Sequence, residues 1–183
     1  MNVVLIGMKH CGKSTLGAAL ARWWECPFYD VDRMIEQTYA CDAGETLTIR
    51  ELFARHGEAR FRQIESHVVC ELYLKLDEPD ATNVVALGGR TATNERISQL
   101  LKGMGLVVYL KVPDDELVAR LRASGLPPFV DRNDPVAAFL DLRRRRDPVY
   151  RQLADRVVEL DALGVDQALD HLIHCIEEHE HAR

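Results

Sequence analysis

The sequence predicts an α/β fold with three layers, in which a central parallel sheet of five strands is flanked by helices. Short apolar runs recur along the chain, helical patterns separate them, and a glycine-rich turn joins the first run to the first helical pattern. Continuous apolar runs are typical of parallel strands buried on both faces. Their alternation with helices favours a doubly wound sheet.

The strands follow from runs of β-branched and other apolar residues. Four such runs predict strands at 2–7, 83–89, 105–112 and 155–161. A weaker run, CPFYDVD, predicts a short fifth strand at 26–32 that ends in acidic residues.

Helical patterns fill the intervals between the strands. They cover 13–25, 31–39, 48–76, 93–103, 113–124, 134–154 and 164–179, and the longest pattern breaks near Gly57. The stretch SGLPPFVDRND (124–134) has two prolines, a glycine and few periodic apolar residues. It predicts a loop that acts as a lid, at about 122–134.

Composition narrows the class of protein. The 183 residues suffice for one α/β domain over 1–183, and the net charge of -6 argues against a nucleic-acid-binding protein. The five cysteines form no CxxC pair, so they indicate neither a zinc site nor a disulfide framework, and they fit a reducing cytoplasm. No signal-peptide pattern and no apolar run of roughly 20 residues is present, so we expect a cytoplasmic protein without membrane contact.

The turn after the first predicted strand matches the phosphate-loop motif G-x-x-x-x-G-K-[ST] through Gly7, Gly12, Lys13 and Ser14. Glycines let several backbone N–H groups converge on one anion, and the N-terminus of the next helix adds its positive dipole end. The lysine can neutralise β- and γ-phosphates, and the hydroxyl can bind Mg²⁺. The alternative is a glycine turn that contains Lys-Ser by chance, but the strand before it and the helix after it favour phosphate binding.

An acidic pair, Asp30 and Asp32, ends the second predicted strand. Two residues apart in an extended chain, the carboxylates share one face, and ligands of parallel sheets bind at the carboxyl ends of strands. A kinase for a small alcohol needs one carboxylate for the hydroxyl proton and another near Mg²⁺. Asp32 is the candidate base and Asp30 the candidate for a water-mediated metal contact. Alternatively, Asp32 only caps the following helix.

Three further features are compatible with an anionic acceptor. Arg62 and Glu65 lie on one helical face, where the carboxylate would hold the arginine against a ligand; a surface ion pair is the alternative. Gly88 and Gly89 allow a close backbone approach to a ligand, or form a simple turn. Arg146 closes the run RRRR, which by default is a solvated basic face.

Together these residues resemble the shikimate kinase family of P-loop enzymes. The resemblance covers nearly the whole chain, and includes the phosphate loop, the D-x-D pair, Gly88–Gly89 and the R-x-P-x-Y at 146–150. Its most specific part is the pattern I-x-x-[IL]-F…G-E-x-x-F-R-x-x-E. The matching residues are Ile49, Leu52, Phe53, Gly57, Glu58, Phe61, Arg62 and Glu65.

The resemblance implies a P-loop kinase fold with a lid and a mechanism that uses ATP and Mg²⁺. By this resemblance, the residues that bind the nucleotide are Gly7, Gly12, Lys13, Ser14, Thr15 and Arg120. Arg120 would lie against the adenine ring. Ser14 and Asp30 would hold the metal, and Lys13 would also act in catalysis.

For the acceptor, the resemblance implies substrate-binding helices at about 31–75. Shikimate would bind through its carboxylate to Arg62 and Arg146, with the Gly88–Gly89 backbone nearby. Asp32 would receive the proton of the 3-hydroxyl, and Phe53 and Phe61 would line the ring.

The chain departs from the family pattern at three places. His10 and Cys11 occupy the crown of the phosphate loop, where the family usually has a further glycine. Arg90 replaces the third glycine after the strand, and Leu126 stands where the lid arginine is expected. Arg122 and Arg132 flank the lid, and we hypothesise that Arg132 supplies the missing catalytic cation.

Three functions are compatible with these features. The leading hypothesis is a monomeric kinase that phosphorylates the 3-hydroxyl of shikimate. A related kinase for another hydroxy acid, such as gluconate or quinate, is favoured by Arg90 and Leu126. A non-catalytic module that binds nucleotide or shikimate is favoured by the absent lid arginine, but Lys13, Ser14 and the acidic pair oppose it.

Overall fold

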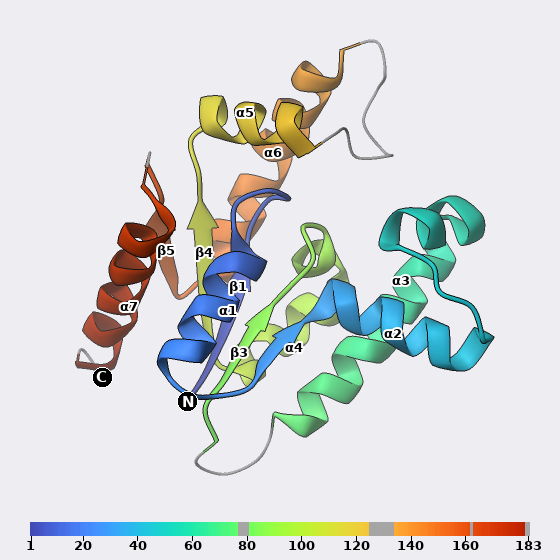
Figure 1. Cartoon of the computed structure of the whole chain (residues 1–183), viewed down its shortest axis with the longest axis horizontal. Coiled ribbons are helices and arrows are strands. Elements are labelled where there is room, and N and C mark those ends of the chain that lie inside the picture. Colours follow the sequence, from blue (N-terminus) through green and yellow to red (C-terminus); the bar gives the residue numbers. More distant parts are fainter. Residues whose placement is uncertain (77–80, 125–133, 162, 182–183) are drawn as a thin grey trace.

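A computed structural model describes residues 1–76, 81–124, 134–161 and 163–181 (Figure 1). Five parallel strands form one sheet, as predicted, and their order is β2-β3-β1-β4-β5. The strands are β1 (Asn2–Ile6), β2 (Phe28–Asp30), β3 (Asn83–Ala86), β4 (Leu106–Lys111) and β5 (Arg156–Glu159). Each lies within a predicted apolar run, so the predicted fold class is confirmed.

The central strand β1 forms the middle of the core. It pairs with β3 through Val4↔Val85 and with β4 through Val4↔Val107, and all three side chains are fully buried. Because helices cover both faces of the sheet, these strands need apolar residues at every position. This explains why the runs are continuous instead of alternating.

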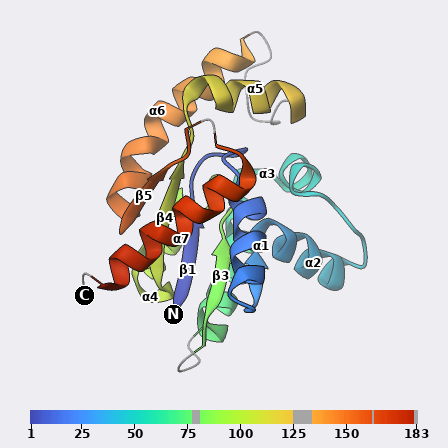
Figure 2. The ribbon, with the colours of Figure 1, turned by 60° about the vertical axis from the view of Figure 1, so that its left-hand side comes forward.

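Helices cover the two faces of the sheet (Figures 1 and 2). The helices of the described ranges are α1 (Lys13–Trp23), α2 (Val31–Ala43), α3 (Ile49–Lys75), α4 (Glu95–Met104), α5 (Asp114–Ser124), α6 (Pro135–Leu153) and α7 (Val165–His181). Helices α1 and α7 contact one face, and α4 and α6 contact the other. The break in α3 lies at Gly57, as predicted, where φ is 72°. A short 3-10 helix, η1 (Thr91–Thr93), was not expected from the sequence.

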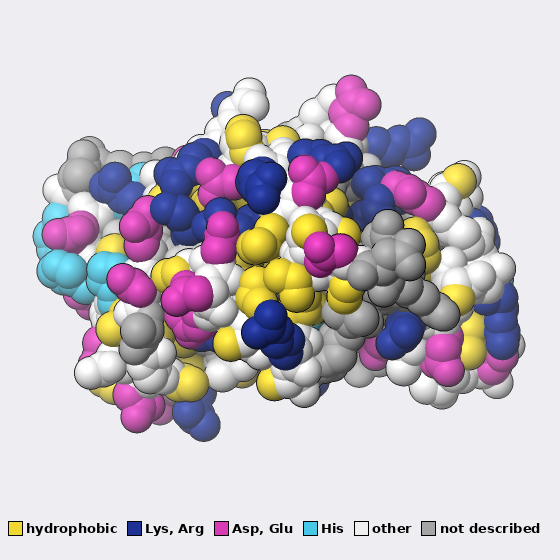
Figure 3. Space-filling view, turned by 90° about the horizontal axis from the view of Figure 1, so that it is seen from above, with side chains coloured by type: hydrophobic (Ala, Val, Ile, Leu, Met, Phe, Trp, Pro, Cys, Tyr) yellow, Lys and Arg dark blue, Asp and Glu magenta, His cyan; other side chains and the backbone are white. Residues whose placement is uncertain are grey.

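The carboxyl ends of the strands meet at the upper edge of the sheet in Figure 1. Seen from that side, Lys and Arg side chains lie among Asp and Glu (Figure 3). The central part of the predicted lid, with Leu126 and Arg132, falls outside the described residues. No helix in the described ranges is long and apolar enough to cross a membrane.

Candidate active site

The loop between β1 and α1 has the backbone of a phosphate cradle. Gly7 has φ 144°, and a Cβ there would lie 2.7 Å from the carbonyl oxygen of Leu110, so only glycine fits. Gly12 has φ 97° and precedes α1, whose first turn contains no acidic residue and no side-chain cap within the described structure. The first N–H groups of α1 therefore remain available for an anion.

Lys13 reaches back across this loop. Its Nζ donates hydrogen bonds to the carbonyl oxygens of Gly7 at 3.0 Å and Met8 at 2.8 Å, and the side chain is 8% exposed. The ammonium group is thus held at the centre of the cradle. His10 has φ 69°, a left-handed conformation that a side chain disfavours, which explains the glycine usual at the crown.

A cleft of about 780 Å³ opens at the carboxyl edge of the sheet and collects most of the predicted site. The predicted residues that line it are Gly12, Lys13, Ser14, Thr15, Asp30, Asp32, Phe53, Phe61, Gly88, Gly89, Arg120 and Arg146. Gly7 and Arg62 lie outside this lining. Arg132 is outside the described residues.

The acidic pair reaches the cleft by a different geometry from the predicted one. β2 ends at Asp30, and Asp32 is already in the first turn of α2, so the pair does not share the face of an extended strand. The expectation of an extended pair was wrong because α2 begins directly after the strand. The capping alternative was also assigned to the wrong residue, since Asp30, not Asp32, accepts a hydrogen bond from the Arg33 backbone N–H at 3.3 Å.

Asp32 has an unusual electrostatic environment. Burial raises its pKa to about 6, the positive charge of Lys13 opposes this shift, and the negative charges of Asp30 and Glu65 add to it. The Asp32 carboxylate also lies against Gly88, where any Cβ would overlap Oδ1. A carboxylate with a raised pKa in a cleft is a candidate general base.

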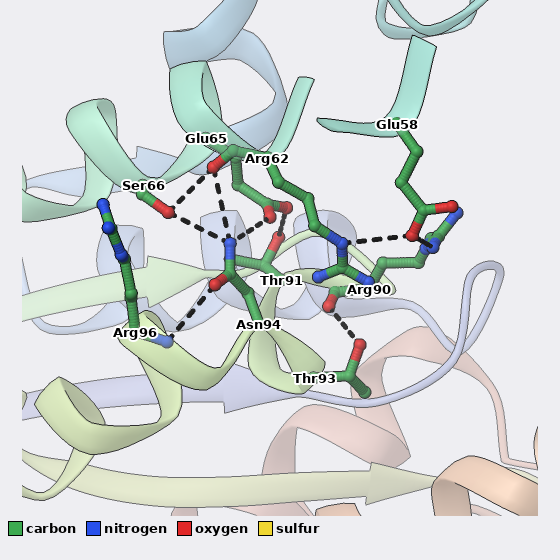
Figure 4. Close-up of polar contacts among 9 residues, drawn as sticks. All are labelled: Glu58, Arg62, Glu65, Ser66, Arg90, Thr91, Thr93, Asn94 and Arg96. Atoms are coloured by element: carbon green, nitrogen blue, oxygen red, sulfur yellow. Dashed lines mark hydrogen bonds and ion pairs between the residues drawn. The ribbon is translucent and has the colours of Figure 1, made fainter. Parts of the chain in front are cut away.

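Glu65 does not hold Arg62, contrary to the interpretation of their spacing. The buried Glu65 carboxylate accepts hydrogen bonds from Thr91 Oγ1 at 2.7 Å and from Asn94 Nδ2 at 3.1 Å (Figure 4). Arg62 instead donates from Nε to Glu58 at 3.1 Å. Glu65 therefore ties α3 to the segment after β3, a contact between distant residues that helical spacing cannot reveal.

Arg146 is not part of a solvated basic face. The side chain is only 7% exposed, and Nη1 donates to the Gly89 carbonyl oxygen at 3.0 Å. Tyr150 Oη donates to the same carbonyl oxygen at 2.5 Å. The pKa of Arg146 is lowered chiefly by burial. Within the described structure Arg146 forms no ion pair, which suits a guanidinium group that receives an anionic ligand.

The glycine pair serves the protein's own contacts. A Cβ on Gly89 would lie 2.9 Å from the backbone nitrogen of Lys9, so the glycines bring β3 close to the phosphate loop and to Asp32. The sequence predicts that the backbone of this pair comes close to a ligand. In the structure it comes close to other atoms of the protein, and Gly88 and Gly89 also line the cleft.

Two aromatic rings and Arg120 also line the cleft. Phe53 and Phe61 stand edge to face with ring centroids 5.8 Å apart, and both line the cleft together with Asp32. Arg120 Nη1 donates to the carbonyl oxygen of His10 at 3.0 Å, and Arg120 pairs with Glu116. The predicted nucleotide and acceptor residues thus line one cleft.

Among the described residues, three further basic side chains line the cleft, although the sequence motifs did not single them out. They are Lys9, Arg33 and Arg50. Lys9 lies within the phosphate-loop motif at a position where the motif allows any residue. The two arginines lie in the first turns of α2 and α3, and nothing in their sequence context distinguishes them from surface arginines.

Comparisons with known proteins agree with this geometry. The family model "Shikimate kinase" matches residues 9–177. A shikimate kinase of Thiobacillus denitrificans is 34% identical over 158 residues, which are 86% of this chain and 80% of that protein. A shikimate kinase of Rhodococcus jostii is 32% identical over 93% of this chain and 94% of its own length.

A solved structure extends the likeness to the fold. The shikimate kinase of Acinetobacter baumannii, in complex with shikimate, superposes with a TM-score of 0.85 at 29% identity, over 97% of this chain and 93% of that one. Shikimate kinases use ATP with Mg²⁺ as phosphoryl donor. The family match over most of the chain, together with the shared fold, shows that this chain belongs to the shikimate kinase family of enzymes.

Proposed function

We propose that this protein transfers the γ-phosphoryl group of ATP to the 3-hydroxyl of shikimate. The observation that carries the proposal is the shared cleft, in which the Lys13 cradle, the Asp32 carboxylate and the buried Arg146 guanidinium face one space. A phosphate donor, an alcohol and a carboxylate each have a matching group there.

The residues present fit ATP and Mg²⁺. The open N-terminus of α1 and the Lys13 ammonium suit the phosphates, and Arg120 borders the space proposed for adenine. Ser14 and Asp30 offer the oxygen ligands that Mg²⁺ prefers. Bound there, the metal would neutralise charge on the phosphate oxygens.

Asp32 acts as the general base in this mechanism. Its pKa of about 6 leaves it ionised at neutral pH but basic enough to accept a proton. Asp32 takes the proton of the 3-hydroxyl, the hydroxyl oxygen forms a bond to the γ-phosphorus, and the bond to ADP breaks. Lys13 stabilises the charge that develops on the transferred group.

The carboxylate end of the acceptor binds Arg146, which lines the cleft, and Arg62, which lies outside the lining and shares the Glu58 carboxylate with Arg90. A guanidinium group matches a planar carboxylate, because its fork can donate to both oxygens. Phe53 and Phe61 offer an apolar wall for the carbon ring. We assign no role to Arg132, which lies outside the described residues.

A coupled assay for ADP release tests the proposal with shikimate as acceptor. The wild-type protein should turn over shikimate, and phosphorus NMR should show the product esterified at the 3-hydroxyl. Lys13→Ala and Asp32→Asn should each reduce turnover strongly. Quinate and gluconate serve as competing acceptors, and faster turnover of either one would replace shikimate as the substrate. Tight binding of ATP and shikimate without product would instead indicate a regulatory module.

We also propose that the enzyme works as a monomer in the reducing cytoplasm. All five cysteines are free thiols, and at least two of them are exposed. The exposed large apolar side chains in the described ranges, such as Trp23 and Leu74, belong to different elements. Light scattering of the purified protein tests the monomer.

A further inference from the structure

Arg90 is a charged residue at the acceptor end of the cleft. It directly follows the Gly88–Gly89 pair and lines the cleft together with Phe53 and Arg146. Its guanidinium carbon lies 5.5 Å from the centroid of the Phe53 ring, and its side chain is 23% exposed. A guanidinium group that lies over an aromatic face is restricted in orientation.

Glu58 links Arg90 to Arg62. The same Oε1 atom accepts a hydrogen bond from Arg62 Nε at 3.1 Å and one from Arg90 Nη2 (Figure 4). Hydrogen bonding to Arg62 and the positive charge of Arg90 lower the pKa of Glu58, so the carboxylate is ionised at neutral pH. One carboxylate thus aligns two guanidinium groups from different elements.

Arg146 adds a third guanidinium group to this region. The positive charges of Arg90 and Arg62 both contribute to the lowered pKa of Arg146, which places the three groups within electrostatic reach of one another. Arg146 is buried and forms no ion pair within the described structure. Burying a guanidinium group beside two others is unfavourable unless an anion joins them.

We propose that Arg90 binds the carboxylate of the acceptor together with Arg146, and that Glu58 is the positioning residue that holds Arg90 and Arg62 towards it. This inference rests on the proposed function and deepens it, because it names the group that selects acceptors with a negative charge. An acceptor without that charge forms no ion pair with Arg90 or Arg146. Such an acceptor gains nothing from Arg90.

The test compares shikimate with its neutral methyl ester in steady-state kinetics. Arg90→Met removes the charge but keeps an unbranched side chain against Phe53. A charge-assisted hydrogen bond corresponds to a factor of about 10 or more in binding. We expect Arg90→Met to raise the KM for shikimate by about tenfold or more, and to leave the KM for the ester and for ATP unchanged. Arg90→Lys should recover part of the loss.

Two further variants separate a direct role from a general effect of charge. Arg145→Met removes a cation from α6 whose side chain is 76% exposed, and should change neither KM. Glu58→Gln should raise the KM for shikimate in the wild type, but by a smaller factor in the Arg90→Met background, because Glu58 acts partly through Arg90.

Equilibrium titration with shikimate alone gives a second readout that does not depend on turnover. Binding should weaken by the same factor in Arg90→Met. An unchanged KM and affinity in this variant, or an equal loss for the ester, would overturn the inference while the proposed function stands. A wild-type protein that neither binds nor phosphorylates shikimate would remove both.

Discussion

The Asp32 carboxylate lies directly against the α-carbon of Gly88, so closely that a Cβ at Gly88 would overlap Asp32 Oδ1. The same Cβ would lie 2.7 Å from Thr91 Oγ1. The glycine thus lets the proposed base approach β3, while the neighbouring hydroxyl is held by Glu65. The position of Asp32 therefore depends on the absence of a side chain one strand away.

Replacing Gly88 by alanine should displace Asp32 and lower turnover. Because small misplacements of a reacting group are costly, we expect kcat to fall by a factor on the order of 10², with little change in the KM for ATP. Gly164→Ala is the matched control, since among the described residues its Cβ would meet within 4 Å only Gln167 Oε1, at 3.9 Å. Unchanged kcat in Gly88→Ala would contradict the proposed position of the base.

Asp32 should also control the pH dependence of catalysis. Burial raises its pKa to about 6, so Asp32 becomes protonated below that pH and can no longer accept the hydroxyl proton. We expect kcat/KM for the acceptor to fall about tenfold per pH unit below pH 6, since this ratio reports the free enzyme. The slope should disappear in Asp32→Asn, whose kcat should be lower by a factor on the order of 10²–10⁴.

The same shift predicts that Asp32→Asn stabilises the fold at neutral pH. The folded pKa of about 6 exceeds the ordinary aspartate pKa of 3.8, so the folded state binds the proton more tightly than the unfolded one. Stability therefore decreases as pH rises from about 4 to about 6, by up to about 3 kcal/mol, and then stays level. Urea unfolding at pH 4 and pH 8 should show the gain of Asp32→Asn only at pH 8. An equal gain at both values would refute this explanation.

Local signals in the sequence predict the fold and much of the candidate site. Apolar runs locate all five strands, and the phosphate-loop motif locates the cradle, because both depend on neighbouring residues. The partner of Glu65 could not be predicted, since Thr91 and Asn94 meet it only through the tertiary fold. The helix that begins at Val31 was predicted, but the predicted strand at 26–32 overlapped it, since the apolar run does not show that β2 stops at Asp30.

The hydrogen bond from Thr91 to Glu65 should contribute to stability. Thr91→Val keeps the shape of the side chain and removes the donor, which leaves one oxygen of a buried carboxylate without its partner. We expect the free energy of unfolding to fall by about 1–3 kcal/mol. Ser98→Ala is the control, because its exposed hydroxyl donates to the Glu95 carbonyl oxygen on the same helix. Equal effects of the two variants in urea unfolding would argue against the special role of Glu65.

His10 and Glu25 are the two described residues other than glycine with positive φ, 69° and 52°. Glycine adopts this conformation without the cost that a Cβ imposes, so His10→Gly and Glu25→Gly should each raise stability by roughly 1 kcal/mol. Their effects on activity should differ. His10 lines the cleft and Glu25 does not, so only His10→Gly should raise the KM for ATP, because a looser cradle must be ordered on binding. Thermal unfolding and ATP titrations of both variants test this, and an equal KM in the two would show that the strained crown has no part in nucleotide binding.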